Sequence, residues 1–411
     1  MNLIFLTMSR ITGISSRGIY IDLMRKFRDE GHQVYIVSPR ERSLDFKPGL
    51  VEVDGIHILG VKTLKLQKTN MIEKGLGQVL VERQFKRAIK RSLSAVKFDL
   101  ILYSTPPISF PSVIQYLRKS SPDAKTYLLL KDIFPQNAVD IGILSTSGVK
   151  GMLYKFFRKK EKVLYSLSDY IGCMSPANVD YLLMHNPEII AKRVEIAPNS
   201  IELKKDKSNQ GDSTESEIED ERSRICSKYN LPNDRPIFIY GGNLGKPQGI
   251  PFLIKCLEAN STRNDCHFVV VGDGTERAKL ESWYMSFKPR SVTIMNRLPK
   301  DDYDLLAKSC DVGLIFLDHR FTIPNFPSRL LPYLENKMPI IAATDPNCDT
   351  GKIAEENGFG FWCESDSVIA FTTILDKMIH SDRKAMGERG YEYLCKNYQV
   401  SNTYETIIKH V

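Results

Sequence analysis

The chain has 411 residues, of which 42% are hydrophobic, 26% charged and 9% aromatic. This composition is that of an ordinary globular protein, and it excludes a mostly disordered chain, a collagen-like chain and a small disulfide-stapled scaffold. At about 150 residues per domain, the length predicts two or three domains. The net charge of +8 is uneven, with +12 on residues 1–200 and −4 on residues 201–411, so the first half is expected to meet an anionic partner.

Cysteine usage and the first residues indicate the compartment. No two of the eight cysteines have C-x-x-C spacing, and no Cys/His group has zinc-ligand spacing. We therefore expect reduced thiols, no metal site and a cytoplasmic protein. The first apolar run, Leu3–Met8, is too short for a secretory signal. The longest uncharged stretch, residues 100–117, holds three prolines, so no membrane-spanning helix is expected.

Strand-like runs alternate with helical patterns along the first half. Amphipathic stretches such as Ile19–Asp29, which ends at Gly31, separate these runs. Continuous apolar strands between helices predict a parallel sheet with helices on both faces. The predicted strands are Leu3–Met8, Gln33–Ser38, Asp99–Ser104, Lys125–Leu130, Tyr170–Ser175 and Val194–Ala197.

Residues 204–224 interrupt the pattern, because they are highly charged and contain one isoleucine and no aromatic residue. We predict an acidic flexible linker whose second half starts a helix reaching Tyr229. The alternation then resumes with strands at Pro236–Tyr240, His267–Val271, Ser291–Met295, Val312–Leu317, Pro339–Ala343 and Gly360–Cys363.

The predicted fold class is therefore α/β, with two Rossmann-like doubly wound parallel-sheet domains facing a cleft. The expected domains are residues 1–203 and residues 225–385. Residues 386–411 are expected to form a helical tail that packs back on the first domain.

The segment Tyr240–Gly249, with the sequence YGGNLGKPQG, carries the strongest functional signal. It follows a predicted strand and precedes the helical pattern Ile250–Leu257. Glycines let backbone N–H groups approach a ligand, and a helix N-terminus attracts an anion. Lys246 adds a full positive charge. We interpret the segment as a phosphate-binding loop; the alternative is a tight turn with a solvated lysine.

Two further segments follow predicted strands. Val271–Gly274 lacks the full dinucleotide pattern, so a turn with Asp273 as a helix cap is an equal alternative. Pro324–Arg329 precedes the helical pattern Leu330–Asn336, with Ser328 as the expected N-cap. A cation in the first turn opposes the helix dipole, so Arg329 is a candidate for anion binding, the alternative being a solvated surface arginine.

Taken in order, GGNLGKPQG, VGDG and FPSR before LLPYLENKMPII resemble the C-terminal half of GT-B glycosyltransferases of family 4. The resemblance is greatest to the bacterial capsule and O-antigen subgroup with fucosamine-transferase-like enzymes. The first half agrees with that family at Arg17–Tyr20, Gly31–Val34, Ser104–Pro107, Lys131–Pro135 and Pro198–Glu202.

The resemblance implies a metal-independent, retaining hexosyltransferase that uses a nucleotide-sugar, with UDP favoured, as co-substrate and needs no cofactor. Cations and helix N-termini at the donor diphosphate would stabilise the charge that grows as the glycosidic bond breaks. The implied phosphate contacts are Gly242, Asn243, Lys246, Gln248, Ser328 and Arg329, and the implied base and ribose contacts are Gly272, Asp273 and Gly274.

The sequence departs from the family at its Glu-x7-Glu element, where Pro324 and Pro332 stand. Proline cannot accept hydrogen bonds from a ribose through its side chain, so we consider Glu335, one turn further on, as the substitute. The subgroup often lacks these glutamates, and we do not infer an inactive enzyme from their absence.

In the first half, Asp132 follows a strand and is a candidate for orienting the acceptor hydroxyl or accepting its proton. A turn or cap aspartate is the alternative. Gly13 and Arg17 follow the first strand and are expected to meet an anionic acceptor or the donor phosphate. For Arg17, a plain position at a helix start is the alternative.

Two basic amphipathic helices are predicted at residues 83–97 and 151–167. We expect their apolar residues, including Phe85, Ile89, Phe156 and Phe157, to pack on the sheet. Their basic faces would be solvated and could attract an anionic membrane surface.

The sequence thus predicts a transferase that acts on a glycan or an undecaprenyl-linked glycan in capsule or O-antigen biosynthesis. It would be cytoplasmic or peripheral on the inner face of the cytoplasmic membrane. One alternative is a nucleotide-sugar 2-epimerase on the same fold. Another is a non-catalytic, membrane-associated partner that binds sugar nucleotides. No nucleic-acid partner is expected, because no recognised binding module is present.

Overall fold

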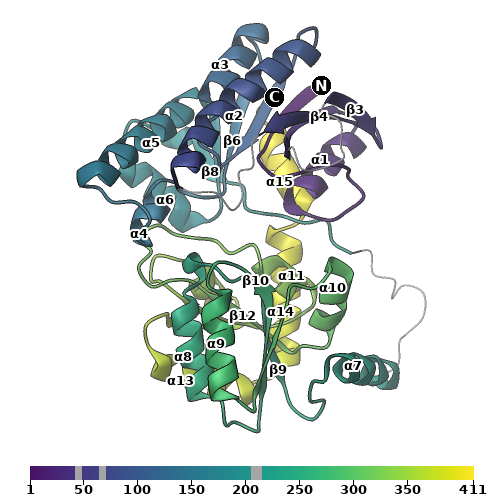
Figure 1. Ribbon diagram of the computed structural model, residues 1–411. Helices are drawn as coiled ribbons and strands as arrows, with labels where there is room; N and C mark the ends of the chain where they lie inside the picture. Colours follow the sequence, from purple (N-terminus) through teal and green to yellow (C-terminus); the bar gives the residue numbers. More distant parts are fainter. Residues whose placement is uncertain (42–48, 64–70, 205–214) are drawn as a thin grey trace. The chain divides into compact units, whose positions relative to one another are not determined.

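The computed structural model describes residues 1–41, 49–63, 71–204 and 215–411. The chain forms two compact units (Figure 1). Unit 1 consists of Met1–Glu202 and Tyr398–Val411, and unit 2 of Leu203–Asn397. The chain therefore passes from unit 1 to unit 2 and returns to unit 1 near its C-terminal end.

Unit 1 contains an eight-stranded sheet with the order β3-β4-β2-β1-β5-β6-β7-β8. Neighbouring strands are parallel except for the antiparallel pair β3–β4. The six strands predicted for the first half are confirmed, whereas the β3–β4 hairpin is missing from the prediction. The strands are β1 Asn2–Leu6, β2 Gln33–Glu41, β3 Gly49–Val53, β4 Ile56–Thr63, β5 Leu100–Ser104, β6 Lys125–Leu130, β7 Tyr170–Cys173 and β8 Val194–Ile196.

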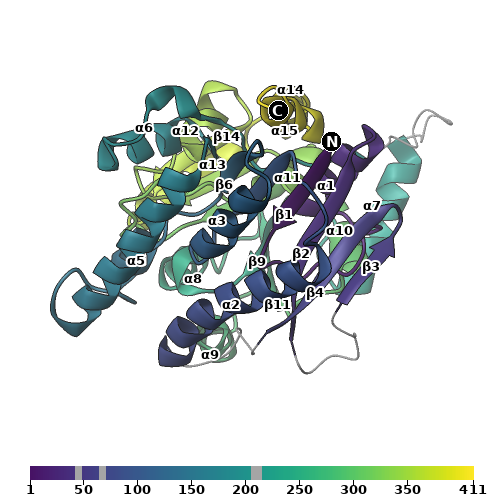
Figure 2. The ribbon, with the colours of Figure 1, turned by 90° about the horizontal axis from the view of Figure 1, so that it is seen from above.

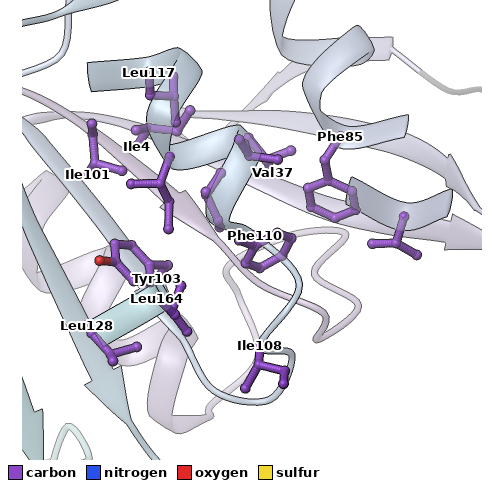
Figure 3. Packing of buried hydrophobic residues seen from close by; sticks show 14 of the residues in the cluster. Ile4, Val37, Phe85, Ile101, Tyr103, Ile108, Phe110, Leu117, Leu128 and Leu164 are labelled. Carbon is purple, nitrogen blue, oxygen red and sulfur yellow. The ribbon is translucent and has the colours of Figure 1, made fainter. Parts of the chain in front are cut away.

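Helices cover both faces of this sheet. On one face, α2 (Met71–Ser92), α3 (Pro111–Ser120) and α5 (Gly148–Leu167) bury side chains against the strands. Figure 3 shows Phe85, Leu117 and Leu164 of these helices converging on strand residues such as Ile101. On the other face lie α1 (Ile19–Asp29) and α15 (Val400–Ile408), where the rings of Phe27 and Tyr404 are 4.9 Å apart. Two shorter helices are α4 (Gln136–Asp140) and α6 (Pro176–His185).

The two predicted basic helices exist, with two corrections. Helix α2 ends at Ser92 instead of reaching residue 97, because the chain turns there toward β5. Phe85 and Ile89 are buried as expected, and so is Phe157 of α5. Phe156, however, is 44% exposed. It is turned about 100° from Phe157 around the helix and so lies toward solvent.

Unit 2 contains an all-parallel sheet with the order β11-β10-β9-β12-β13-β14, which confirms the six predicted strands. Helices α8 (Ile250–Ala259), α9 (Arg277–Phe287) and α13 (Val368–Ile379) bury apolar residues against one face. The strands are β9 Ile237–Asn243, β10 His267–Asp273, β11 Val292–Met295, β12 Val312–Phe316, β13 Ile340–Thr344 and β14 Gly360–Glu364.

Further helices of unit 2 are α10 (Lys300–Lys308), α11 (Leu330–Glu335), α12 (Thr350–Glu356) and α14 (Arg383–Asn397). Tyr303 of α10 and Tyr333 of α11 contact glycines of β9 and β12, so these two helices cover the second face. Figure 2 shows the same units from above.

The segments around the unit boundaries differ in detail from the expected limits. Of the expected linker, residues 205–214 lie outside the described residues, Lys204 precedes them, and residues 215–224 belong to helix α7 (Glu215–Tyr229), the predicted helix. The expected tail, residues 386–411, divides at Asn397. Its first part lies in α14 of unit 2, and its second part contains α15 of unit 1.

The structure also bears on the state of the cysteines and on the apolar character of the helices. All eight cysteines are free thiols, and seven of them are buried. Within the described ranges, no helix is both long enough and apolar enough to cross a bilayer.

Candidate active site

The two glycine-rich segments of unit 2 lie side by side at the carboxyl ends of β9 and β10. Gly242 is paired in register with Gly272, and Asn243 with Asp273. A Cβ atom on Gly272 would lie 1.8 Å from the carbonyl oxygen of Gly242, and one on Gly274 would lie 2.4 Å from that of Leu244. Larger residues cannot fit at these two positions, so the glycines are what lets the two strand ends approach each other.

The loop after β9 is shaped by its own side chains. The Gln248 Oε1 atom accepts hydrogen bonds from Asn243 Nδ2 at 2.8 Å and from the Gly245 N–H at 3.2 Å. Gly249 has a left-handed φ of 58° and caps α8. Asn243 and Gln248 therefore fold the loop, while Lys246 is exposed and forms no ion pair with any residue in the described ranges.

Arg329 lies beside this loop. The centre of its guanidinium group is 4.4 Å from the centroid of the Tyr240 ring. Its Nη2 atom is 3.6 Å from the position that a Cβ atom on Gly242 would take. Its Nη1 atom is buried and has no hydrogen-bond partner among residues 1–41, 49–63, 71–204 and 215–411. A cation with a free donor next to glycine backbone is suited to bind an anion.

Two residues that the sequence analysis did not single out support this arrangement. The Tyr333 hydroxyl accepts a hydrogen bond from the Gly241 N–H and donates one to the Ile239 carbonyl, both at 3.1 Å. Arg277 donates to the carbonyls of Gly272 and Met295 and so holds the loop after β10. In the sequence, Arg277 directly follows VGDGTE and Tyr333 lies in LLPYLE, but neither pattern indicates which backbone group the side chain binds.

Two predicted caps are wrong. Helix α11 starts at Leu330 with Arg329 at its N-cap position, so the exposed Ser328 is not the cap. Helix α9 starts at Arg277 with Glu276 at its N-cap, so Asp273 lies too far upstream to cap it. Instead, the Asp273 carboxylate accepts a hydrogen bond from the Gly274 N–H at 2.8 Å. Both Ser328 and Asp273 stay in the loops that carry the other candidates.

Glu335 has a partner elsewhere in unit 2. Its carboxylate accepts a hydrogen bond from the Lys204 backbone N–H at 3.0 Å and lies 3.6 Å from the Lys204 ammonium. The carboxylate thus anchors the start of unit 2. Pro332 occupies the first turn of α11, where a missing N–H is tolerated.

In unit 1, Asp132 follows β6, and Asn137 holds its carboxylate. Asn137 Nδ2 donates to both carboxylate oxygens, at 2.8 and 2.9 Å. Burial raises the pKa of the Asp132 carboxyl to about 6, although the hydrogen bonds from Asn137 act in the opposite direction. Burial also lowers the pKa of the adjacent Lys131 to about 7, and its ammonium donates to the Ala197 carbonyl at 2.9 Å. Both groups are thus poised to titrate near neutral pH.

Arg17 and Gly13 belong to the loop between β1 and α1. The Arg17 guanidinium donates to the backbone carbonyl of Glu202, so it is engaged within unit 1. Gly13 is partly buried near Val53. Buried Ser38 and Arg40 both donate to the Ile11 carbonyl and fix the start of the loop. Within unit 1, then, Arg17 is hydrogen-bonded to the backbone of Glu202, and its contact with an anionic acceptor or a donor phosphate stays a prediction.

The described part of the chain contains no group of three or more His, Cys, Asp or Glu residues that could hold a metal ion. The candidate residues of unit 2 offer the cations of Lys246 and Arg329 and backbone N–H groups, and those of unit 1 offer the Asp132 carboxyl group, whose pKa is raised.

Comparisons with known proteins show which proteins this chain is similar to. The family model described as "Glycosyl transferases group 1" matches residues 221–393. The protein named "Probable glycosyltransferase WbjE" from Pseudomonas aeruginosa is 22% identical over 333 residues, which are 80% of this chain and 78% of that protein.

Solved structures have the same architecture. Sucrose-phosphate synthase from Thermosynechococcus elongatus has a TM-score of 0.73 at 13% identity, with 99% of this chain and 97% of that chain covered. Anabaena Alr3699/HepE in complex with UDP-glucose has a TM-score of 0.67 at 13% identity, with 100% of this chain and 99% of that chain covered. Residues 221–393 therefore match the family of group 1 glycosyl transferases, and the chain has the GT-B fold of the solved neighbours.

Proposed function

We propose that the protein transfers a sugar from a UDP-sugar, with retention of configuration and without a metal ion, to a glycan or lipid-linked glycan acceptor in surface polysaccharide assembly. The observation that carries the proposal is the Arg329 guanidinium, whose buried Nη1 atom has no partner in the described ranges and which lies beside Gly242. The UDP-glucose complex of the Anabaena neighbour supports UDP as the nucleotide.

In this proposal the donor diphosphate is the leaving group. Arg329, the backbone N–H groups of the Gly242 and Gly272 loops, and the exposed Lys246 would face its oxygens. Negative charge grows on these oxygens as the glycosidic bond breaks, so fixed donors stabilise the transition state more than the ground state. Asp132 would orient the acceptor hydroxyl or accept its proton.

One observation favours a second candidate, a non-catalytic protein that binds sugar nucleotides. Pro324 and Pro332 offer no carboxylate to a ribose, and Glu335 is engaged by Lys204. Such a protein would bind the nucleotide and show no turnover with any acceptor. A 2-epimerase, in contrast, would change its sugar nucleotide when no acceptor is present.

The donor proposal predicts selective stabilisation by one nucleotide. We expect UDP to raise the melting temperature more than GDP, ADP, TDP or CDP, and we expect this shift to persist in EDTA. A ligand at 100 times its Kd stabilises a protein by about 2.7 kcal/mol, which gives a measurable shift. The measurement is a melting-temperature panel of the five nucleotides with and without EDTA.

Each outcome of this panel has a clear meaning. A shift that EDTA abolishes would contradict metal independence. A larger shift with another nucleotide would contradict UDP as the donor base. No shift with any nucleotide would contradict the phosphate-binding loops, and the role of a membrane-associated partner would then become the better explanation.

We also propose that the protein binds an anionic membrane surface through the exposed face of α5. Val149 is 79% exposed, Met152 66% and Phe156 44%. These residues are three and four positions apart, so they lie on one side of the helix, and the exposed Lys155 and Lys159 lie beside them. Apolar side chains flanked by lysines match an anionic bilayer surface, where each cation contributes on the order of 1 kcal/mol.

We expect the chain to bind vesicles that contain anionic phosphatidylglycerol and to bind vesicles of neutral phosphatidylcholine at least tenfold more weakly. The double variant M152E/F156E should bind these vesicles more weakly, because both substitutions place a negative charge among the exposed apolar residues of α5. The matched control is I369E, since Ile369 is 81% exposed on α13 of unit 2. Vesicle co-sedimentation is the measurement, and equal binding of the three proteins would overturn the assignment of α5.

A further inference from the structure

A buried carboxyl group follows β13 at the same sheet edge as the donor loops. Asp345 comes directly after Thr344, the last residue of β13, and it is completely buried. Its Oδ1 atom accepts hydrogen bonds from the backbone N–H groups of Asn347 and Cys348, both at 3.0 Å. Asp345 thereby closes the turn of residues 345–348.

Keeping this carboxyl group buried is unfavourable for folding. The Oδ2 atom has no hydrogen-bond partner among the residues that the structure describes. Burial raises the pKa of Asp345 to about 7, although the backbone hydrogen bonds oppose this rise. An apolar residue of similar size would avoid the desolvation of an unpaired polar atom.

The turn is connected to the segment that leads to Arg329. Asn347 Nδ2 donates to the Phe321 carbonyl at 2.8 Å. Cys348 Sγ donates to the Asn325 carbonyl at 3.0 Å. Two backbone carbonyls of the segment 321–325 are thus held by side chains of the turn that Asp345 closes, and Asn325 is four residues before Arg329.

We infer that Asp345 is a positioning residue for the donor site, acting through the turn 345–348 to hold the segment 321–325 and so the guanidinium of Arg329. The inference rests on the proposed function, because it assumes that Arg329 faces the donor. Asp345 itself is buried under the turn and is assigned no contact with the substrate.

The test compares three variants by calorimetric titration with UDP. N347A removes one of the two connections from an exposed position, and we expect a rise of about fivefold in the Kd for UDP, the loss typical of one hydrogen bond. D345L removes the acceptor that closes the turn, and we expect a rise of about tenfold or more. D345N keeps the Oδ1 acceptor, so its Kd should stay within about twofold of the wild-type value.

The matched control is N357A. Asn357 is also exposed, and its Nδ2 atom donates to the Ile353 carbonyl at 2.8 Å, but it lies at the end of α12. We expect no change in the Kd for UDP. A double-mutant cycle of N347A with R329A should show that the two losses do not add, because Asn347 acts through Arg329.

The outcomes separate this inference from the proposed function. If the wild-type protein does not bind UDP, the proposed function fails. If the wild-type protein binds UDP, R329A weakens the binding and N347A does not, the positioning role is wrong and the donor site stands. N347A decides the question by itself if D345L does not fold. Fully additive losses of N347A and R329A would also overturn the role of Asp345.

Discussion

Replacing Arg329 by alanine should reduce turnover of the nucleotide-sugar donor by about a hundredfold or more. Removing one preorganised donor from a site of growing negative charge has costs of this size. The melting temperature should change much less than the rate, because the contact of Arg329 with the Tyr240 ring contributes about 0.5–1 kcal/mol. The measurement is initial-rate kinetics of donor consumption together with thermal unfolding.

Three variants separate an anion-binding role from a structural one. R329K keeps a charge and should retain part of the activity, although it lacks the planar fork. K246A should cost less than R329A, because Lys246 is exposed and its charge is screened by water and salt. R263A is the matched control, since Arg263 pairs with Asp265 and Asp376 at 2.6 Å in the same unit. A large fall in melting temperature with R329A alone would make Arg329 a structural residue.

Replacing Asp132 by asparagine should reduce kcat/KM by about a hundredfold to ten-thousandfold, the range for loss of a positioned acid or base. The pKa of this carboxyl is about 6. The ionised form accepts a proton and the neutral form does not, so wild-type kcat/KM should fall as the pH drops through about 6. D132N should lack this acid limb, and pH–rate profiles of both proteins are the measurement.

The control for this experiment is D140N. Asp140 lies nearby in α4 and accepts a hydrogen bond from Gln136 Nε2 at 2.8 Å. The neighbouring Lys131 has a pKa lowered to about 7, so beside Asp132 in unit 1 it is a second group that could produce a limb near neutral pH. An acid limb that persists unchanged in D132N would therefore move the assignment from Asp132 to Lys131. Activity of D132N above half of the wild-type value would contradict both roles proposed for Asp132.

Most strands of the fold could be predicted from the sequence, because a parallel strand covered on both faces is an uninterrupted apolar run. The hairpin β3–β4 is different. Residues 49–53 alternate between partly buried and exposed positions at the sheet edge, so their apolar signal is weak. The available clue is the dipeptide Asp54–Gly55, whose φ angles are 48° and 76°, a typical hairpin turn.

The sequence predicted those site residues whose role depends on the neighbouring residues in the chain, and it did not predict contacts between residues that are distant in sequence. A glycine next to a strand end indicates that another backbone segment approaches closely, and the positions of Gly272 and Gly274 agree with that interpretation. The partner of Glu335, in contrast, lies 131 residues away in sequence. Its engagement with Lys204 depends on tertiary folding, and nothing in the local pattern LLPYLENK indicates it.

The return of the chain to unit 1 has a consequence for the order of synthesis. Helix α15 buries Val400 and Ile407 in the core that also holds Phe27 of α1. The His32 ring nitrogen and the Tyr404 hydroxyl are 2.9 Å apart in the same region. These residues leave the ribosome only after all of unit 2 has been made. During translation, the face of unit 1 that carries α1 therefore lacks α15 until almost 200 intervening residues, Leu203–Asn397, have been synthesised.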